Sequence, residues 1–239
     1  MAKEELHFFD KIDEKTVEEY LVNFEKAKKN QLVGEKTPTY SYDPMVPERM
    51  FAKLPDAKII WILRNPIDRA YSNYWHAVKK GVEMDTFEDA VKDDDKRYKE
   101  NIFRAYIRRS IYVEQIERYL EFYPLEQMYF ITFEKLKNDP ENEITKLVEF
   151  LKIPSFNFKE VPSSNKTYLP RSISLEYYSK KLFGKSIAWK LIHKLNASST
   201  SGYVPMSQDI HERLVEYFKP YNEELSKYGI EIELWVEED

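Results

Sequence analysis

Residues 58–66 read Lys-Ile-Ile-Trp-Ile-Leu-Arg-Asn-Pro, an apolar run that stops at Arg64 and is followed by Asn65 and Pro66. An apolar run without polar alternation is typical of a strand in a parallel sheet that is covered on both faces. Asparagine is a preferred helix N-cap, and proline suits the first helical position. The stretch therefore predicts a strand that leads directly into a helix, with Arg64 at the carboxyl end of the strand.

A second apolar run, Met128-Tyr-Phe-Ile-Thr-Phe133, predicts another buried strand, and Leu32-Val33 suggests a short third one. Helical patterns surround these runs, and the last helix is expected to bend or end at Pro220. These patterns cover residues 13–29, 65–80, 86–91, 107–122, 139–151 and the stretch from 207 onward. Strands joined by helical crossovers indicate an α/β protein, whose ligands gather at the carboxyl ends of the strands.

The composition favours one folded domain over residues 1–239, with 42% hydrophobic residues and only 5 glycines. The chain has no cysteine and only 4 histidines, which lie far apart, so neither disulfides nor a metal site are expected. The lack of a long apolar run and of a signal-peptide pattern predicts a cytoplasmic chain without a membrane partner. A net charge of -5 disfavours nucleic acid as a partner.

Positive charge is concentrated late in the chain, where Ser163–Val204 holds seven Lys or Arg residues and a single acid, Glu176. The basic residues are Lys166, Arg171, Lys180, Lys181, Lys185, Lys190 and Lys194. This segment is a candidate anion-binding surface. The alternative is an ordinary solvated helical face, and for most of the lysines the two interpretations stay open.

Arg64 and Ser72 are candidates for gripping one phosphate from two sides. A guanidinium is a planar fork of donors that matches a phosphate, and Ser72 lies about two turns into the helix that follows Arg64. The alternative is that Arg64 and Arg69 pair with Asp68 or other acids, while Ser72 has no role. Spacing alone does not separate these interpretations.

The segment Ile62-Leu-Arg-Asn-Pro-Ile-Asp-Arg-Ala-Tyr-Ser-Asn-Tyr74 resembles the 3′-phosphate-binding motif of sulfotransferases. Upstream, Gly34-Glu-Lys-Thr-Pro-Thr-Tyr40 and Val46-Pro-Glu-Arg49 look like the preceding stretch of the heparan-sulfate-type and bacterial branches. The resemblance implies the three-layer α/β fold of P-loop NTPases, with a central parallel sheet flanked by helices. It also implies 3′-phosphoadenosine 5′-phosphosulfate as cosubstrate, bound through Arg64 and Ser72, and chemistry that needs no metal.

Glu5-Leu-His-Phe-Phe-Asp10 is similar to the catalytic strand of the glucosaminyl 3-O-sulfotransferase branch. By that resemblance Glu5 is the general base, assisted by His7 and Asp10, and Lys36 lies near the transferred group. In an extended segment Glu5, His7 and Phe9 would share one face, and Asp10 would join them only if the strand ended or twisted. The alternatives are that Glu5 is a solvated terminal acid and that Lys36 pairs with Glu35 on the surface.

Two later segments also resemble the family. Arg109-Ser-Ile-Tyr112 opens a helix whose counterpart in the family lies near the nucleotide, which implies a binding role for Ser110 or Tyr112. The basic segment occupies the place of the family's late cosubstrate loop, and Lys166 and Arg171 are its candidate ligands.

The family also has a first strand and a glycine-rich, lysine-containing loop for the 5′-phosphosulfate, and the 5 isolated glycines form no such loop. We therefore expect an N-terminally incomplete sulfotransferase-like domain, missing its first strand and phosphate loop. It would be a truncated form, a fragment completed by another chain, or a remnant that has lost sulfuryl transfer.

The function that follows is sulfuryl transfer to an acceptor hydroxyl or amine, with a saccharide as a candidate acceptor, in a chain that forms a homo-oligomer or needs a completing chain. The alternative is a non-catalytic sulfotransferase-fold module that binds a 3′-phosphonucleotide or an anionic polymer. A nucleotide-kinase relative is a weaker alternative, because kinases need the same absent loop.

Overall fold

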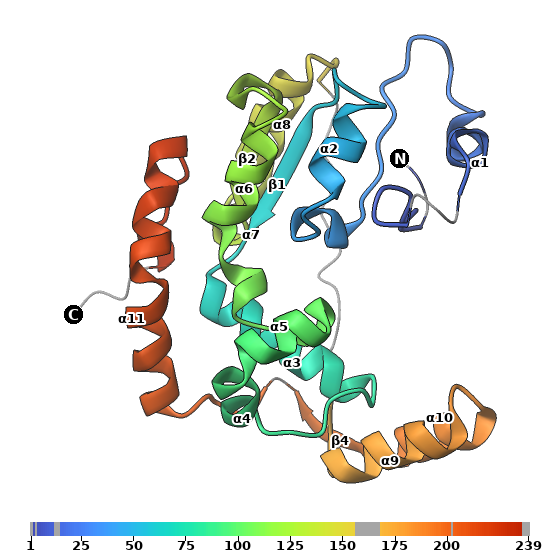
Figure 1. The fold of residues 1–239 in the computed structure, drawn as a ribbon, viewed down its shortest axis with the longest axis vertical. Helices are drawn as coiled ribbons and strands as arrows, with labels where there is room; N and C mark the ends of the chain where they lie inside the picture. The colour runs from blue at the N-terminus through green and yellow to red at the C-terminus, as the bar shows by residue number, and fades with distance from the viewer. Residues whose placement is uncertain (1, 3, 12–14, 156–167, 202, 236–239) are drawn as a thin grey trace. The chain divides into compact units, whose positions relative to one another are not determined.

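The computed structural model describes residues 2, 4–11, 15–155, 168–201 and 203–235, and its ribbon is drawn in Figure 1. The chain divides into two compact units. The first consists of Met1–Leu63, Tyr112–Asn157 and Glu224–Ile232, and the second of Arg64–Ile111, Phe158–Glu223 and Glu233–Asp239. The expectation of a single domain over residues 1–239 stays a prediction.

The first unit contains a parallel pair of strands, β1 (Ile59–Leu63) and β2 (Met128–Thr132), in register from Ile59 opposite Met128 to Leu63 opposite Thr132. This pairing confirms both predicted strands and their parallel direction. The expectation that both faces are covered is wrong for β1, because Ile60 and Ile62 are 40% and 58% exposed. Its inward residues are buried, and the Trp61 ring meets Tyr119 edge-on at 5.2 Å.

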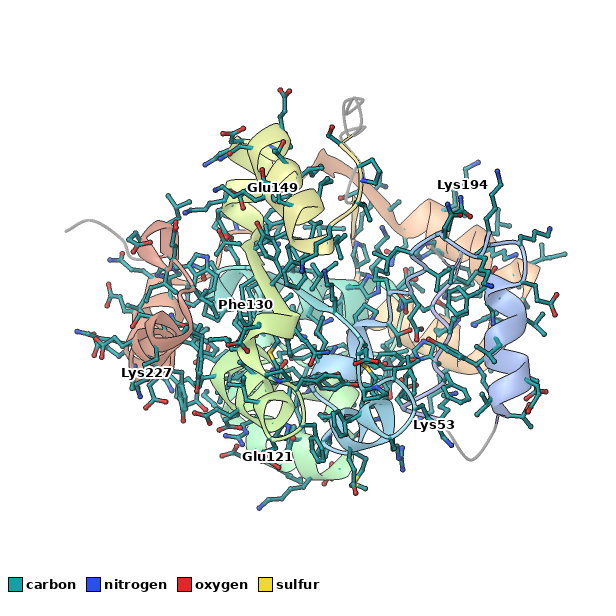
Figure 2. The ribbon with its side chains drawn as sticks, turned by 90° about the horizontal axis from the view of Figure 1, so that it is seen from above. Lys53, Glu121, Phe130, Glu149, Lys194 and Lys227 are labelled. Carbon is teal, nitrogen blue, oxygen red and sulfur yellow. The ribbon has the colours of Figure 1, made fainter. Side chains whose placement is uncertain are left out.

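Helices flank this pair in the first unit. α7 (Phe133–Asn138) and α8 (Pro140–Leu151) contact β2, and α2 (Val46–Phe51) contacts α6 (Tyr112–Leu120). In Figure 2, Phe130 on β2 and Glu149 on α8 are labelled. Asp139 caps α8 as predicted, because its carboxylate accepts from the Asn142 N–H.

Two predicted elements of the first unit are shorter or absent. The helix expected over 13–29 is confirmed only as α1 (Val17–Leu21), which continues into a 3-10 turn, η2 (Val22–Phe24). The expected strand at Leu32-Val33 is wrong, since these residues belong to neither strand pair of the described residues and are 58% and 44% exposed. The remaining short turns of this unit are η3 (Pro38–Ser41), η6 (Leu125–Gln127) and η7 (Ser226–Tyr228).

The second unit begins with α3 (Pro66–Lys79), whose N-cap is Asn65 as predicted: the side-chain oxygen accepts from the N–H groups of Ile67 and Asp68. It continues with α4 (Phe87–Lys92), α5 (Asp94–Glu100), η4 (Ile102–Arg104) and η5 (Arg108–Ser110). The helix expected over 107–122 therefore begins at Tyr112, after the η5 turn.

The later part of the second unit contains two strands that the sequence did not predict and two helices in the segment for which a solvated helical face was the alternative. β3 (Tyr168–Pro170) pairs antiparallel with β4 (Ala197–Ser201), and between them lie α9 (Ile173–Phe183) and α10 (Ile187–Asn196). α11 (Gln208–Leu225) runs past Pro220, so the helix does not end there, and its last residues belong to the first unit. A final turn, η8 (Glu233–Trp235), follows.

A buried ionic network holds the centre of the second unit. The Glu83 carboxylate is 0% exposed and accepts from Arg97 Nη1 at 2.5 Å and from the Tyr106 hydroxyl at 2.8 Å. Arg97 also bonds to Asp85. Because a buried charge is costly unless it is paired and hydrogen-bonded, this network fixes the chain around residues 83–106.

No helix within the described ranges is long and apolar enough to cross a bilayer. In the same ranges, no cluster of three or more His, Asp or Glu side chains is arranged to hold a metal ion.

Candidate active site

Two segments of the first unit, residues 5–10 and 35–40, bring three of the sequence-predicted catalytic residues together. The Lys36 Nζ lies 3.4 Å from Oε1 of Glu5, and the His7 Nε2 lies 3.5 Å from Oε2 of the same carboxylate. A carboxylate, an imidazole and an ammonium group therefore meet at one point. These are the group types needed to accept a proton and to stabilise negative charge.

The chain turns at His7. Its backbone φ of 49° lies in the left-handed region, which is rare and strained for a residue with a side chain. The predicted extended segment with Glu5, His7 and Phe9 on one face is therefore wrong: Phe9 is 1% exposed, whereas the Glu5 side chain is 42% exposed. The turn also lets Asp10 join the cluster, as the sequence analysis required.

Asp10 orients the imidazole. The His7 Nδ1 donates to Oδ2 of Asp10 at 2.8 Å, and the Thr39 hydroxyl donates to the same oxygen. With Nδ1 carrying that proton, Nε2 is the ring nitrogen that faces Glu5. The carboxylate of Asp10, buried at 8% exposure, thus sets which nitrogen is available at the cluster.

Tyr40 stabilises the turn at His7 through hydrogen bonds. The sequence did not predict this contribution. Its hydroxyl oxygen accepts from the backbone N–H groups of Phe8 and Phe9 at 2.8 and 3.3 Å, and the hydroxyl donates to Glu35 at 3.3 Å. Burial raises the pKa of Tyr40 to about 12 and also raises the pKa of the Glu35 carboxyl. The concentration of hydroxyl residues around Pro38, with Thr37, Thr39, Tyr40 and Ser41, was the available signal for this role.

The cluster is open to a substrate. The Lys36 side chain is 65% exposed, and that of His7 is 31% exposed. Lys36 pairs with Glu5, whereas Glu35 accepts from the hydroxyls of Thr37 and Tyr40. The alternative from the sequence was a surface pair of Glu35 with Lys36. These side chains therefore do not adopt that arrangement.

The predicted phosphate ligands belong to the second unit, where each has its own hydrogen-bond partner. Arg64 Nη2 bonds to Asp68 Oδ2 at 2.9 Å, and the Ser72 hydroxyl lies 3.1 Å from the Tyr203 hydroxyl. The pairing of Arg64 with Asp68 matches the alternative weighed from the sequence. The Arg64 side chain stays 33% exposed, and the Asp68 side chain is 60% exposed.

Ser110 lies inside the second unit at 1% exposure. Its hydroxyl donates to the Tyr106 carbonyl at 3.1 Å and accepts from Arg69 Nη1 at 3.3 Å. The loop before it is fixed by Asp94, whose carboxylate accepts from three successive backbone N–H groups, those of residues 106–108. Tyr112, the first residue of α6, belongs to the first unit and is 7% exposed. Nucleotide-binding roles for Ser110 and Tyr112 stay predictions.

Of the two candidates in the basic segment, only Arg171 lies within the described residues. Lys166 lies outside the described residues. Arg171 follows β3 with an exposed side chain, and its backbone N–H donates to the Asn196 carbonyl at 2.7 Å. The charged helices α9 and α10 form most of the rest of this segment.

Comparison with known proteins gives consistent results at three levels. The model of the sulfotransferase domain matches residues 3–199. Human heparan sulfate glucosamine 3-O-sulfotransferase 3B1 is 27% identical over 218 residues, which are 91% of this chain and 53% of that protein. The bifunctional heparan sulfate N-deacetylase/N-sulfotransferase 1 of Caenorhabditis elegans is 28% identical over 232 residues, 94% of this chain and 25% of that protein.

The fold agrees with these sequence matches. The crystal structure of a sulfotransferase from Alicyclobacillus acidocaldarius superposes with a TM-score of 0.73 at 24% identity, covering 98% of this chain and 86% of that one. The chain spans about half the length of the 3-O-sulfotransferase relatives. The predicted α/β fold with a parallel sheet flanked by helices is confirmed, and the predicted lack of a phosphate loop stays a prediction. With a family match over residues 3–199 and a matching fold, this chain belongs to the sulfotransferase domain family.

Proposed function

We propose that this chain transfers a sulfuryl group from 3′-phosphoadenosine 5′-phosphosulfate to a hydroxyl or amine of a saccharide. The observation that carries the proposal is the meeting of Glu5, His7 and Lys36 at one solvent-accessible point of the first unit. As a stabilising feature alone, an exposed Glu–Lys pair contributes only about 0–1 kcal/mol. The strained backbone of His7 is better explained by a role of its side chain.

Glu5 is proposed to act as the general base. As the acceptor oxygen or nitrogen forms its bond to sulfur, its proton passes to the Glu5 carboxylate, so that a full positive charge never develops on the acceptor. The bond between sulfur and the bridging oxygen of the 5′-phosphate breaks, and its electron pair leaves with the nucleotide. His7 is held by Asp10 through Nδ1 and positions the Glu5 carboxylate when Nε2 also carries a proton, because a carboxylate oxygen can only accept.

Lys36 is proposed to balance negative charge on the transferred group. Its ammonium group is fixed 3.4 Å from Glu5, so a sulfuryl group attacked from the Glu5 side would lie within reach of Nζ. Charge that is spread over the sulfuryl oxygens in the transition state is stabilised by such a preplaced cation.

Arg64 and Ser72 are proposed to hold the 3′-phosphate of the cosubstrate. The residue types fit: a guanidinium binds a phosphate through two parallel donors, and a hydroxyl adds a third. Arg64 bonds to Asp68 and Ser72 to Tyr203, and a phosphate can replace each of these hydrogen bonds. Asn65 caps the start of α3, so the helix that carries Ser72 begins two residues after Arg64.

The saccharide acceptor is supported by the relatives. Two that match over more than nine-tenths of this chain are named as sulfotransferases of heparan sulfate, one acting at the 3-O position of glucosamine and one on nitrogen. The atom that attacks sulfur is an oxygen in one kind of acceptor and a nitrogen in the other. A carboxylate base such as Glu5 serves either one.

The test is a transfer assay with purified chain, 3′-phosphoadenosine 5′-phosphosulfate labelled in its sulfate, and a panel of acceptors. The panel contains N-acetylated and de-N-sulfated heparan chains, and a phenol as a non-saccharide acceptor. Label transferred to the saccharides supports the proposal. Binding of the nucleotide without transfer to any acceptor would instead favour the non-catalytic alternative, and transfer to the phenol alone would overturn the acceptor class.

A further inference from the structure

Helices α9 and α10 form a hairpin in the second unit, the orange part of the ribbon in Figure 1. The two helices pack against each other, and α9 contacts α3. Ser172 and Ser186 cap their N-termini, and Gly184, at φ 59°, makes the turn between them. The hairpin is therefore defined by its own caps and turn, and it is attached to the rest of the second unit along one side.

The attached side of the hairpin is polar. Glu176, Ser179 and Asn196 are 0%, 5% and 4% exposed, and the Glu176 carboxylate bonds to His193 Nδ1 at 2.5 Å and to Asn196 Nδ2 at 3.0 Å. The α3 end approaches this side so closely that a Cβ placed on Gly81 would lie 2.9 Å from the Glu176 carbonyl oxygen. The hydrogen-bonding side of the hairpin is thus the buried one.

The outward side of the hairpin is apolar. On α10, Ile187, Leu191 and Leu195 follow one another at four-residue spacing, so they share one face, and they are 84%, 59% and 70% exposed. On α9, Leu175 and Leu182 are 49% and 76% exposed. A helix pair normally buries its leucines and exposes its polar residues. This pair leaves its leucines exposed as well, which indicates that an apolar medium or partner covers the outward side.

The same hairpin is strongly basic. Residues 177–208 contain no Asp or Glu, although the chain as a whole has a net charge of -5. The lysines of this stretch are Lys180, Lys181, Lys185, Lys190 and Lys194. All except Lys180, which lies over the Trp189 ring at 3.9 Å, belong to exposed positions, and Lys194 is labelled in Figure 2. Whatever covers the leucines must also accept several positive charges.

The exposed apolar side chains and the positive charge of the hairpin together favour one kind of binding partner. A second copy of the chain, docked face to face, would set lysines against lysines, which opposes association. An anionic lipid surface satisfies both properties, because lysines bind the headgroups while leucine and isoleucine side chains enter the acyl boundary. We propose that the outward face of the α9–α10 hairpin binds anionic lipid bilayers and holds the protein at the membrane surface.

This inference goes beyond the proposed sulfuryl transfer and does not depend on it. The sequence-based expectation of no membrane partner rested on the lack of a spanning run. A hairpin that lies in the interface needs no such run, because its apolar side chains reach only the outer part of the bilayer.

The first test is sedimentation of the full chain with vesicles. Vesicles of phosphatidylcholine mixed with phosphatidylglycerol are expected to bind it at least about tenfold better than phosphatidylcholine alone, and added salt should weaken the binding. The triple variant Ile187→Ser, Leu191→Ser, Leu195→Ser is expected to lose about tenfold or more of this binding. The matched control is Leu125→Ser, an exposed leucine of the first unit at 39%, which should bind like wild type.

A second readout reports where the hairpin goes. The chain has no cysteine, so Leu191→Cys can carry a single environment-sensitive dye, with Leu125→Cys as its control. We expect a blue shift on mixed vesicles for position 191 and none for position 125. Equal shifts at both positions, or binding that survives the triple variant, would overturn the proposal. So would a dimer in solution that the triple variant dissociates, because the occupant would then be a second copy.

Discussion

The ammonium group of Lys36 and the carboxylate of Glu5 lie 3.4 Å apart, and this pair joins the two segments that build the cluster in the first unit. Either residue alone is a common surface charge. Together with His7, they place a base and a cation where a proton and a negative charge would have to be handled in sulfuryl transfer.

Replacing Lys36 with methionine removes this cation and keeps the length of the side chain. We expect kcat for transfer to fall by about 10²-fold, with little change in the KM for the acceptor, because the charge acts on the transition state. Lys29→Met, at an exposed position of the same unit, is the control. A Lys36→Met enzyme that turns over like this control would show that the cation has no catalytic part.

Replacing Arg64 with alanine tests the proposed 3′-phosphate site. Titration calorimetry with 3′-phosphoadenosine 5′-phosphate should show binding at least about tenfold weaker, the loss of one charge-assisted hydrogen bond. Arg213→Ala is a matched control, because Arg213 also pairs with an aspartate four residues away, Asp209, on a helix of the second unit. Equal effects of the two substitutions would mean that Arg64 has no part in binding the 3′-phosphate.

Glu83 makes the stability of the protein dependent on pH. Burial acts to raise its pKa, but hydrogen bonds from Arg97 and Tyr106, with the charge of Arg97, outweigh burial and lower the pKa. A lowered carboxyl pKa stabilises the fold above the ordinary value of 4.5, and this stability is lost as pH falls through the folded-state pKa.

The Glu83→Gln variant should therefore be less stable than wild type at pH 7 by about 3–5 kcal/mol, since a buried arginine loses its partner. The difference should shrink as the pH is lowered below 4.5, which urea unfolding at several pH values would measure. Glu88→Gln, which breaks only the exposed pair of Glu88 with Lys92, should change little. A constant difference at all pH values would contradict the assigned cause.

Gly81 tests how the hairpin is attached. Its φ is 65°, and a Cβ there would lie 2.7 Å from the Lys180 Cβ, so Gly81→Ala combines backbone strain with a clash. We expect a destabilisation clearly above the roughly 1 kcal/mol of strain alone. Gly229→Ala, at φ 70° with nothing near, isolates that strain, and Gly34→Ala should be nearly neutral. Thermal unfolding of the three variants should rank them in this order.

Much of the first unit could be predicted because its signals are local. The run before Arg64 and the run from Met128 became parallel strands, and the Asp139 cap starts a predicted helix, as the Asn65 cap does in the second unit. The exposure of Ile60 and Ile62 was not predictable, because an apolar run shows what a strand tolerates and not whether a helix covers each face.

The residues of the candidate site were predicted, but the backbone turn that brings them together was not. The resemblance to the family singled out Glu5, His7 and Lys36, and the structure brings them together. The left-handed turn at His7 could not be predicted, because it depends on contacts with residues far along the chain: the Tyr40 hydroxyl, which accepts from Phe8 and Phe9, and the Thr39 hydroxyl, which bonds to Asp10. The exposure of the leucines on α9 and α10 could not be predicted either, because leucines at helical spacing are typical of a face that packs on the core.

The most direct measurement of the central claim is the transfer rate of Glu5→Gln beside that of Glu4→Gln, each checked for an unchanged unfolding midpoint. Glu4 is the adjacent exposed acid, so the two substitutions remove the same charge one residue apart. The proposed role of Glu5 predicts that kcat falls by about 10²- to 10⁴-fold for Glu5→Gln and stays near wild type for Glu4→Gln. Two variants with equal rates, close to that of wild type, would contradict it.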